Sequence, residues 1–162
     1  DLDALVKLEL GAFKSSDGLV SRRAFRYHMN SANQIFVARV KPGGSCLAGY
    51  ILVFNRKHTA RIYSLAVDPE FRRQGVARAL VRCALAQCTA NRLQKVTLEV
   101  RATNISAIHL YKLLGFIEKR RRPNYYDDGE DACCMVLTLP QKGSYGEHKI
   151  FSKAANDQVQ KS

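Results

Sequence analysis

The sequence predicts an α/β (α+β) domain in which helices flank a mostly antiparallel central sheet. Apolar spacing and helix caps predict helices in four segments, and strand patterns bounded by turn residues appear in six others. The order is helix, helix, three strands, helix, strand, helix, two strands, which is typical of helices packed against such a sheet. With 162 residues, of which 46% are apolar and 25% charged, the chain can bury the core of one globular domain.

The first half of the chain is predicted to hold two helices and three strands. Helical spacing of apolar residues predicts an amphipathic helix over residues 2–13. Ser21 is a suitable N-cap for a short helix that carries Phe25. Three apolar runs bounded by turn residues then predict strands: 34–40, 47–54 and 61–67. The third strand ends at Asp68-Pro69, because proline disfavours its continuation.

A helix, a strand and another helix are expected next. Periodic apolar residues predict a helix from Gly75 to about Thr89. The strand predicted at residues 96–101 alternates, and its two faces are Val96, Leu98 and Val100, and Thr97, Glu99 and Arg101. Asn104 then caps a helix that carries Tyr111 two turns further along, on the same side.

Two strands and a tail complete the prediction. Residues 116–121 and 132–139 resemble an antiparallel pair, and the loop at 123–129 is long for a plain hairpin. From Pro140 onward the sequence is polar and aperiodic. We therefore expect a single domain at residues 1–139 and a loose C-terminal tail at residues 140–162.

The net charge of +12 favours an anionic partner, although a soluble surface can also simply be basic. The basic residues are scattered rather than interleaved with aromatic residues on one face, so we do not expect direct nucleic-acid binding. No apolar run approaches the ~20 residues that cross a bilayer, so no membrane partner is expected. The cysteines form no C-x-x-C pair and the histidines show no ligand spacing. We expect buried cysteines in a reducing, cytoplasmic compartment and no metal site.

A basic turn stands between the third strand and the helix that follows. Its residues are Arg72, Arg73, Gln74, Gly75, Val76, Ala77 and Arg78. The unpaired amides of a helix N-terminus lie here among arginines, which favours binding of a phosphate or pyrophosphate. The alternative is an ordinary strand-to-helix turn whose arginines are solvated.

Glu99 and Tyr111 are candidate catalytic residues. Glu99 lies mid-strand and could accept a proton directly or through water, or it could be a solvated surface residue. Asn104 needs no role beyond that of a helix cap. Tyr111 lies among apolar helix residues and could be part of the core, although a buried hydroxyl then needs a partner.

Arg72-Arg73-Gln74-Gly75-Val76-Ala77 matches the phosphate-binding signature R/Q-x-x-G-x-G/A. Together with its further motifs, the chain resembles the GNAT superfamily of acetyl-CoA-dependent N-acetyltransferases. Within that superfamily, it most resembles the branch of ribosomal-protein-alanine N-acetyltransferases. The resemblance covers residues 47–139. Its further motifs are Ser64–Pro69, Leu98–Asn104, Ala107–Phe116, Asn124–Tyr126 and Gly129–Ala132.

The resemblance implies a GNAT-like fold and a role for each matching position. The backbone of Leu65, Ala66 and Val67 pairs with the pantetheine arm of acetyl-CoA, the amides from Arg73 to Arg78 hold the pyrophosphate, and Asn104 bonds the pantetheine end. Glu99 accepts the proton of the amine, Tyr111 protonates the departing thiolate, and Tyr125 and Tyr126 line the peptide groove. The family also has a strand before the first helix, which we expect to lie upstream of Asp1.

The implied reaction is transfer of acetyl from acetyl-CoA to a protein N-terminal α-amine, by direct attack in a ternary complex. A free α-amine has a pKa of about 7.7–8.0 and a lysine about 10.4, so the α-amine is far more easily deprotonated. A ribosomal protein is one candidate acceptor. Two alternatives remain. The acceptor could be a small amine such as a polyamine or amino-sugar, or the chain could be a non-catalytic acyl-CoA-binding module or a basic adaptor on an RNA-rich particle.

Overall fold

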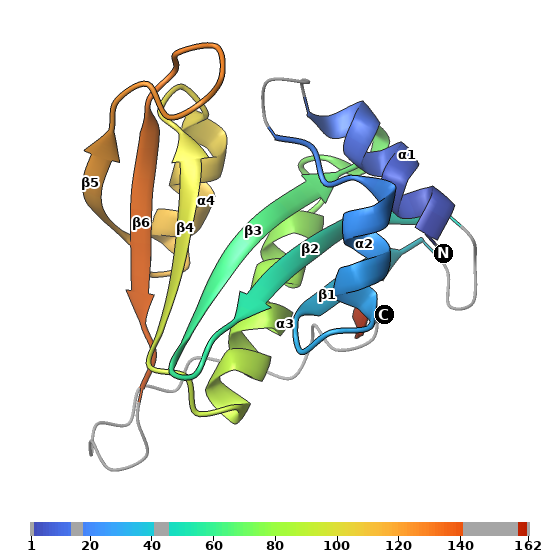
Figure 1. Cartoon of the computed structure of the whole chain (residues 1–162), viewed down its shortest axis with the longest axis horizontal. Coiled ribbons are helices and arrows are strands. Elements are labelled where there is room, and N and C mark those ends of the chain that lie inside the picture. The colour runs from blue at the N-terminus through green and yellow to red at the C-terminus, as the bar shows by residue number, and fades with distance from the viewer. Residues whose placement is uncertain (1, 14–17, 41–45, 141–158, 162) are drawn as a thin grey trace.

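The computed structural model describes residues 2–13, 18–40, 46–140 and 159–161, and all helices and strands named below lie within them (Figure 1). The helices are α1 (Leu2–Ala12), α2 (Arg22–Met29), α3 (Val76–Ala90) and α4 (Ile105–Leu113), with a short 3₁₀ helix at Pro69–Phe71. The strands are β1 (Gln34–Arg39), β2 (Leu47–Asn55), β3 (Thr59–Val67), β4 (Lys95–Arg101), β5 (Ile117–Arg122), β6 (Ala132–Thr138) and β7 (Val159–Lys161).

The described strands form one sheet in the order β5-β6-β4-β3-β2-β1-β7. Neighbours pair antiparallel throughout, except that β3 and β4 are parallel. Their connection passes through α3, as parallel strands require a crossover. The parallel pairing joins Thr59–Ile62 to Lys95–Leu98 and goes no further. Beyond it the two strands separate, so that the sheet opens into the V visible in Figure 1.

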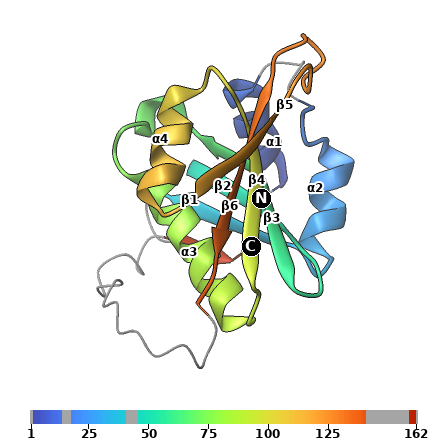
Figure 2. The same cartoon turned by 90° about the vertical axis from the view of Figure 1, so that its left-hand side faces the viewer.

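Two apolar cores lie on opposite faces of the sheet. α3 and α4 cover one face, where Leu80, Ile108 and Leu98 belong to one cluster. α1 and α2 cover the other face, where Leu5 and Phe25 belong to a second cluster. Figure 2 shows the sheet edge-on between the α3–α4 side and the α2 side. Strands β1 and β2 are buried on both faces, which explains why their sequences are continuous apolar runs.

The predicted mixed fold, with its mostly antiparallel sheet flanked by helices, is confirmed. The four helices and six strands expected within it are present, with ends shifted by a few residues. β7 is an additional strand: it lies in the segment expected to be a loose tail and pairs antiparallel with Phe36–Ala38. The rest of that tail from residue 141 to 158, and the turn expected at residues 42–45, lie outside the described residues. Cys46 is exposed, contrary to the expectation that the cysteines are buried.

Gly49 allows a close approach between β2, β3 and the first turn of α3. A Cβ at this position would lie 2.8 Å from the carbonyl oxygen of Ala66 and 3.1 Å from side-chain carbons of Val76 and Leu80. The first contact is with backbone, which cannot move aside as a flexible side chain can. The absence of a side chain at Gly49 therefore allows the first turn of α3 to lie this close to the sheet.

We expect Gly49→Ala to destabilise the fold by about 1–3 kcal/mol, because the added methyl forces β2, β3 and α3 apart. Gly11→Ala is the matched control, since a Cβ at Gly11 in α1 meets nothing within 4 Å. Alanine is the better helix former, so this variant should gain roughly 0.5–1 kcal/mol. Urea unfolding of both proteins measures the two free energies. Equal stability of the two variants would contradict the close-packing role of Gly49.

Candidate active site

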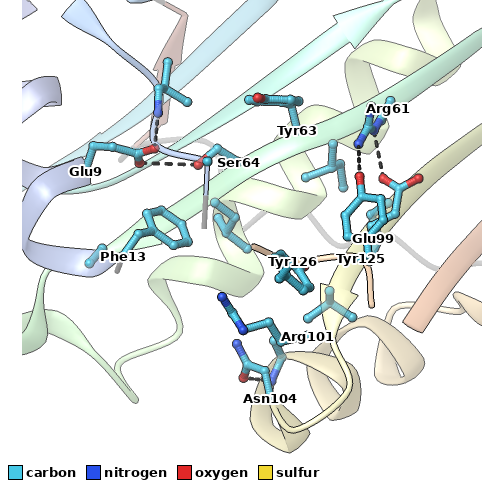
Figure 3. A pocket seen from close by; sticks show the side chains of 18 of the residues that line it. Glu9, Phe13, Arg61, Tyr63, Ser64, Glu99, Arg101, Asn104, Tyr125 and Tyr126 are labelled. Carbon is cyan, nitrogen blue, oxygen red and sulfur yellow. Dashed lines mark hydrogen bonds and ion pairs between the residues drawn. The ribbon is translucent and has the colours of Figure 1, made fainter. Parts of the chain in front are cut away.

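A cavity of about 550 Å³ lies where β3 and β4 separate. Its walls come from α1, β3, β4, α4 and the β5–β6 loop, as Figure 3 shows in part. The cavity brings together six of the residues that the sequence singled out: Leu65, Glu99, Asn104, Tyr111, Tyr125 and Tyr126. Residues more than sixty positions apart in the sequence thus meet in one site.

Glu99 faces the cavity because β4 alternates. Val96, Leu98 and Val100 point into the core beneath α3 and α4, which leaves Glu99 and Arg101 on the opposite face. The carboxylate of Glu99 accepts a hydrogen bond of 2.8 Å from Nε of Arg61, and its side chain is 18% exposed. Glu99 is therefore a partly buried, ion-paired carboxylate, and not the solvated surface residue that the sequence also allowed.

Tyr111 lies on the cavity side of α4. It is 5% exposed and packs edge-on against Phe116, with ring centroids 5.5 Å apart. Burial, and to a lesser degree the charge of Tyr126, raises the pKa of Tyr111, so its hydroxyl remains protonated at neutral pH. The hydroxyl makes no hydrogen bond to any residue that the structure describes. Tyr111 is thus a core residue whose protonated hydroxyl lies at the cavity wall.

Asn104 begins α4 as predicted. Its Oδ1 accepts hydrogen bonds from the amide of Ala107 and the hydroxyl of Ser106, both at 3.1 Å. The amide group at the other end of the side chain, Nδ2, has no hydrogen bond to a described residue. Because Asn104 also lines the cavity, Nδ2 is available to a ligand.

The β5–β6 loop is fixed to the end of β4 by Arg101. The Arg101 guanidinium donates to Asp128 at 2.9 Å and to Glu130 at 2.6 Å, and lies 4.1 Å from the ring centroid of Tyr126. The second oxygen of Glu130 accepts from the amide and hydroxyl of Thr103. The pKa of Asp128 is lowered, above all by Arg101, and that of Glu130 by Thr103 and then Arg101. These contacts hold Tyr126 and its neighbour Tyr125 against the cavity.

A buried polar cluster supports the opposite wall. Glu9 of α1, which is 3% exposed, accepts hydrogen bonds from the amide of Val20 at 2.8 Å and from the hydroxyls of Tyr50 and Ser64. Burial, followed by the charge of Glu9, raises the pKa of Tyr50, so this hydroxyl stays protonated and donates. The cluster ties α1 and the segment before α2 to β2 and β3, at the wall that Glu9, Ser64 and Val20 line.

The basic turn lies at the N-terminus of α3 and does not line the cavity. Its Gly75 has a φ of 83°, which favours glycine, and precedes the helix without any side-chain capping bond. The first amides of α3 are therefore not satisfied by a cap, and the positive end of the helix faces outward among Arg72, Arg73 and Arg78. The features expected of an anion site are present in this turn.

Strand β3 has one open edge next to the cavity. Leu65, Ala66 and Val67 pair on one side with Ile51, Tyr50 and Gly49 of β2. On the other side the pairing with β4 has already ended at Ile62. The carbonyl of Val67 accepts a hydrogen bond of 3.3 Å from Nε of Arg72, and the other backbone groups of β3 that point to this side can pair with an extended ligand.

Comparison with known proteins identifies the family. The sequence profile described as the Acetyltransferase (GNAT) family matches residues 2–116. The chain belongs to the GNAT family. An Escherichia coli K12 relative named ribosomal protein bS18-alanine N-acetyltransferase is 42% identical over 83 residues, which span 49% of this chain and 56% of the relative. The match thus spans little more than half the length of that relative.

Two further comparisons cover more of this GNAT chain. A Bacillus subtilis protein that bears the same name provisionally is 33% identical over 140 residues, or 86% of this chain and 90% of that protein. The crystal structure of the ribosomal-protein-S18-alanine N-acetyltransferase from Escherichia coli superimposes with a TM-score of 0.75 at 30% identity, covering 90% of this chain and 94% of that one. The predicted resemblance to the GNAT superfamily and to this branch is confirmed.

Sequence reasoning missed two charged residues of the GNAT site, Arg61 and Glu9. Arg61 stands two positions before Tyr63 in β3, and both line the cavity. Its place in the strand was therefore readable from the sequence, but its partner Glu99 was not. Glu9 falls on the apolar stripe of α1, where a lone carboxylate signals a buried polar contact. In the part of the chain that the structure describes, no three His, Cys, Asp or Glu side chains cluster as metal ligands, and no helix is long and apolar enough to cross a membrane.

We expect Tyr50→Phe to lower the free energy of unfolding by about 1–3 kcal/mol, because it removes a donor from the buried Glu9 carboxylate. Tyr27→Phe is the matched control, since Tyr27 is 66% exposed on α2. Chemical denaturation followed by circular dichroism measures both variants. If Tyr50→Phe is as stable as Tyr27→Phe, the hydroxyl does not stabilise Glu9 as described.

Proposed function

We propose that this chain is an acetyl-CoA-dependent N-acetyltransferase that acts on the N-terminal α-amine of a protein. The observation that carries the proposal is the meeting of Glu99 and the protonated hydroxyl of Tyr111 in one cavity beside the open edge of β3. Acetyl-CoA supplies an activated acyl group as a thioester. The site residues have to bind it, accept a proton from the amine and return one to the leaving sulfur.

The binding of acetyl-CoA is assigned to three elements. The amides from Arg73 to Arg78 at the uncapped start of α3 suit the pyrophosphate, together with the side chains of Arg72, Gln74 and Arg78. The open edge of β3 at Leu65, Ala66 and Val67 suits the amide groups of the pantetheine arm, as an added strand would. Nδ2 of Asn104 supports the end of that arm. No metal is needed for any of these contacts.

Proton transfer is assigned to Glu99 and Tyr111. An amine attacks a thioester only when neutral, and Glu99 is the partly buried carboxylate of the cavity able to take its proton, directly or through a water molecule. Tyr111 still carries its proton when the thiolate forms, because burial raises its pKa, and the same burial makes an adjacent thiolate more basic. Attack and departure then occur in a ternary complex without a covalent enzyme intermediate.

The acceptor is assigned from the two tyrosines of the β5–β6 loop that line the cavity. Tyr125 and Tyr126 present two perpendicular rings with centroids 5.1 Å apart, a rigid apolar wall suited to a peptide. Relatives whose names specify a ribosomal protein alanine make a ribosomal protein N-terminus the first acceptor to test. We place the reaction in the cytoplasm, where the five unpaired cysteines stay reduced.

A small-molecule amine is the second candidate acceptor. Three carboxylates line the cavity, Glu9, Glu99 and Asp127, against two guanidiniums, Arg61 and Arg101. This excess of negative charge would suit a polyamine or an amino-sugar. A panel of N-terminal peptides, spermidine and amino-sugars, assayed for release of free CoA, separates the two candidates. Turnover of the small amines alone would overturn the assignment to protein N-termini.

We expect Glu99→Gln and Tyr111→Phe each to lower kcat on the preferred peptide by about 10²–10⁴, the usual contribution of general acid–base catalysis. Acetyl-CoA affinity, measured by calorimetry, should stay within a few-fold of the native value. Glu70→Gln and Tyr27→Phe are controls of the same chemistry at exposed positions. Near-native kcat in both cavity variants would contradict the assigned roles.

We expect Arg78→Gln to weaken acetyl-CoA binding by roughly 10-fold or more, since a hydrogen bond between charged groups contributes about 1.5–3 kcal/mol. Arg92→Gln is the control, because Arg92 is an exposed arginine just past the other end of α3. The Kd should depend less steeply on salt in Arg78→Gln than in the native protein. Equal Kd values for the two variants would place the pyrophosphate elsewhere.

A further inference from the structure

Arg61 of β3, Glu99 of β4 and Tyr125 of the β5–β6 loop form a cluster, here called the fork cluster, at the point where β3 and β4 separate (Figure 3). Nε of Arg61 donates to Glu99 at 2.8 Å, and Nη2 donates to the hydroxyl of Tyr125 at 3.2 Å. The same guanidinium lies 5.5 Å from the ring centroid of Tyr63. Three segments of the cavity wall are thus joined through one side chain.

The position of the fork cluster follows from the register of the sheet. Arg61 is paired with Thr97, and the last pair of the parallel ladder is Ile62 with Leu98. Glu99 is the next residue of β4, where no backbone pairing with β3 remains. The guanidinium therefore bridges the two strands just where their hydrogen bonds end. The planar guanidinium holds the carboxylate of Glu99 in one orientation, which a mobile ammonium group would not do.

The guanidinium is a permanent charge inside the cavity. Burial lowers the pKa of Arg61, but Glu99 and then Tyr125 raise it by more, so that its pKa lies above the ordinary value. The Arg61 and Glu99 side chains are 31% and 18% exposed, and both line the cavity. An acceptor amine that reaches Glu99 therefore meets a fixed positive charge beside it. Like charges at short range disfavour each other, and the penalty grows as water is excluded.

We propose that Arg61 is a positioning and selectivity residue of the acetyl transfer, which orients the carboxylate of Glu99 and disfavours acceptors that arrive as ammonium ions. This inference rests on the proposed function. At neutral pH about one α-amine in ten is neutral, against roughly one lysine side chain in a few thousand. A fixed cation beside the base therefore excludes lysine side chains much more strongly than α-amines.

The reaction balances without a proton on or from Arg61. The amine nitrogen forms a bond to the acetyl carbon, the carbon–sulfur bond breaks, and the electron pair leaves with sulfur. Glu99 takes the proton that nitrogen loses, and Tyr111 gives one to the thiolate. Arg61 has no acceptor atom and exchanges no proton, so its effect is on orientation and charge alone.

The test uses two peptides of the same length and composition. One has a free N-terminal α-amine and no lysine, and the other has a blocked N-terminus and a single lysine. Native protein, Arg61→Gln and Arg61→Lys are compared for kcat and KM on each peptide. Arg56→Gln is the matched control, because Arg56 is an exposed arginine at the β2–β3 turn, outside the cavity lining. Thermal unfolding and acetyl-CoA affinity are measured for every variant.

In Arg61→Gln we expect kcat on the α-amine peptide to fall by about 10-fold or more with KM changed little, because Glu99 loses its orientation. The preference for the α-amine peptide, as the ratio of kcat/KM values, should fall by a similar factor. Arg61→Lys should restore that preference, because it restores the charge. It should not restore kcat fully, because an ammonium lacks the planar fork. Arg56→Gln should match the native protein.

Unchanged kcat and preference in Arg61→Gln would overturn the role of Arg61 and leave the proposed function intact. Loss of acetyl-CoA affinity and of activity on both peptides by the same factor would also overturn it, since Arg61 would then be only structural. If the native protein binds acetyl-CoA but acetylates neither peptide, the assignment to protein amines fails, and the role of Arg61 falls with it.

Discussion

Strands β3 and β4 pair over Thr59–Ile62 and Lys95–Leu98 and then separate, and the candidate active site depends on that separation. A sheet whose strands part leaves backbone donors and acceptors without partners along one edge, which is unfavourable unless water or a ligand satisfies them. The separation is stable because α3 and α4 cover one face of both halves with a continuous apolar core, from Leu80 to Tyr111. The helices therefore hold the two halves of the sheet together where no backbone hydrogen bonds join β3 to β4.

The walls of the open cleft are fixed by polar clusters in which the charged groups have partners. The Glu9 cluster joins α1 to β2 and β3 on one wall, and Arg101 joins the β5–β6 loop to β4 on the other. Arg61 connects the walls at the base of the cleft. A partly buried charge without a partner would destabilise the fold, so these pairings let a polar site exist beside an apolar core. The open edge of β3 and the Tyr111 hydroxyl remain for ligands.

The sequence predicted those parts of the fold and site that depend on local pattern. Alternation in residues 96–101 placed Glu99 opposite the core, and the strand-to-helix change at Gly75 located the start of α3. The partner of Glu99 depends on the register of β3 with β4, which no local pattern encodes, and so Arg61 was missed. β7 has three residues in a polar segment and pairs with a strand more than 120 positions earlier, so no periodicity reveals it. The roles of the individual site residues stay predictions.

The net charge of +12 favours anionic ligands, whereas the side chains that line the cavity carry more negative than positive charge. Exposed cations gather on the turn before α3 and along β5, which carries Lys119, Arg120, Arg121 and Arg122. The cavity instead has more carboxylates than guanidiniums, and the exposed Asp127 at its rim has no ion pair with a described residue. Screening confines surface charge to about 8 Å at physiological salt, so each region acts on the ligand next to it. The basic turn, which lies outside the cavity lining, can therefore attract an anionic donor without adding its positive charge to the site of the acceptor.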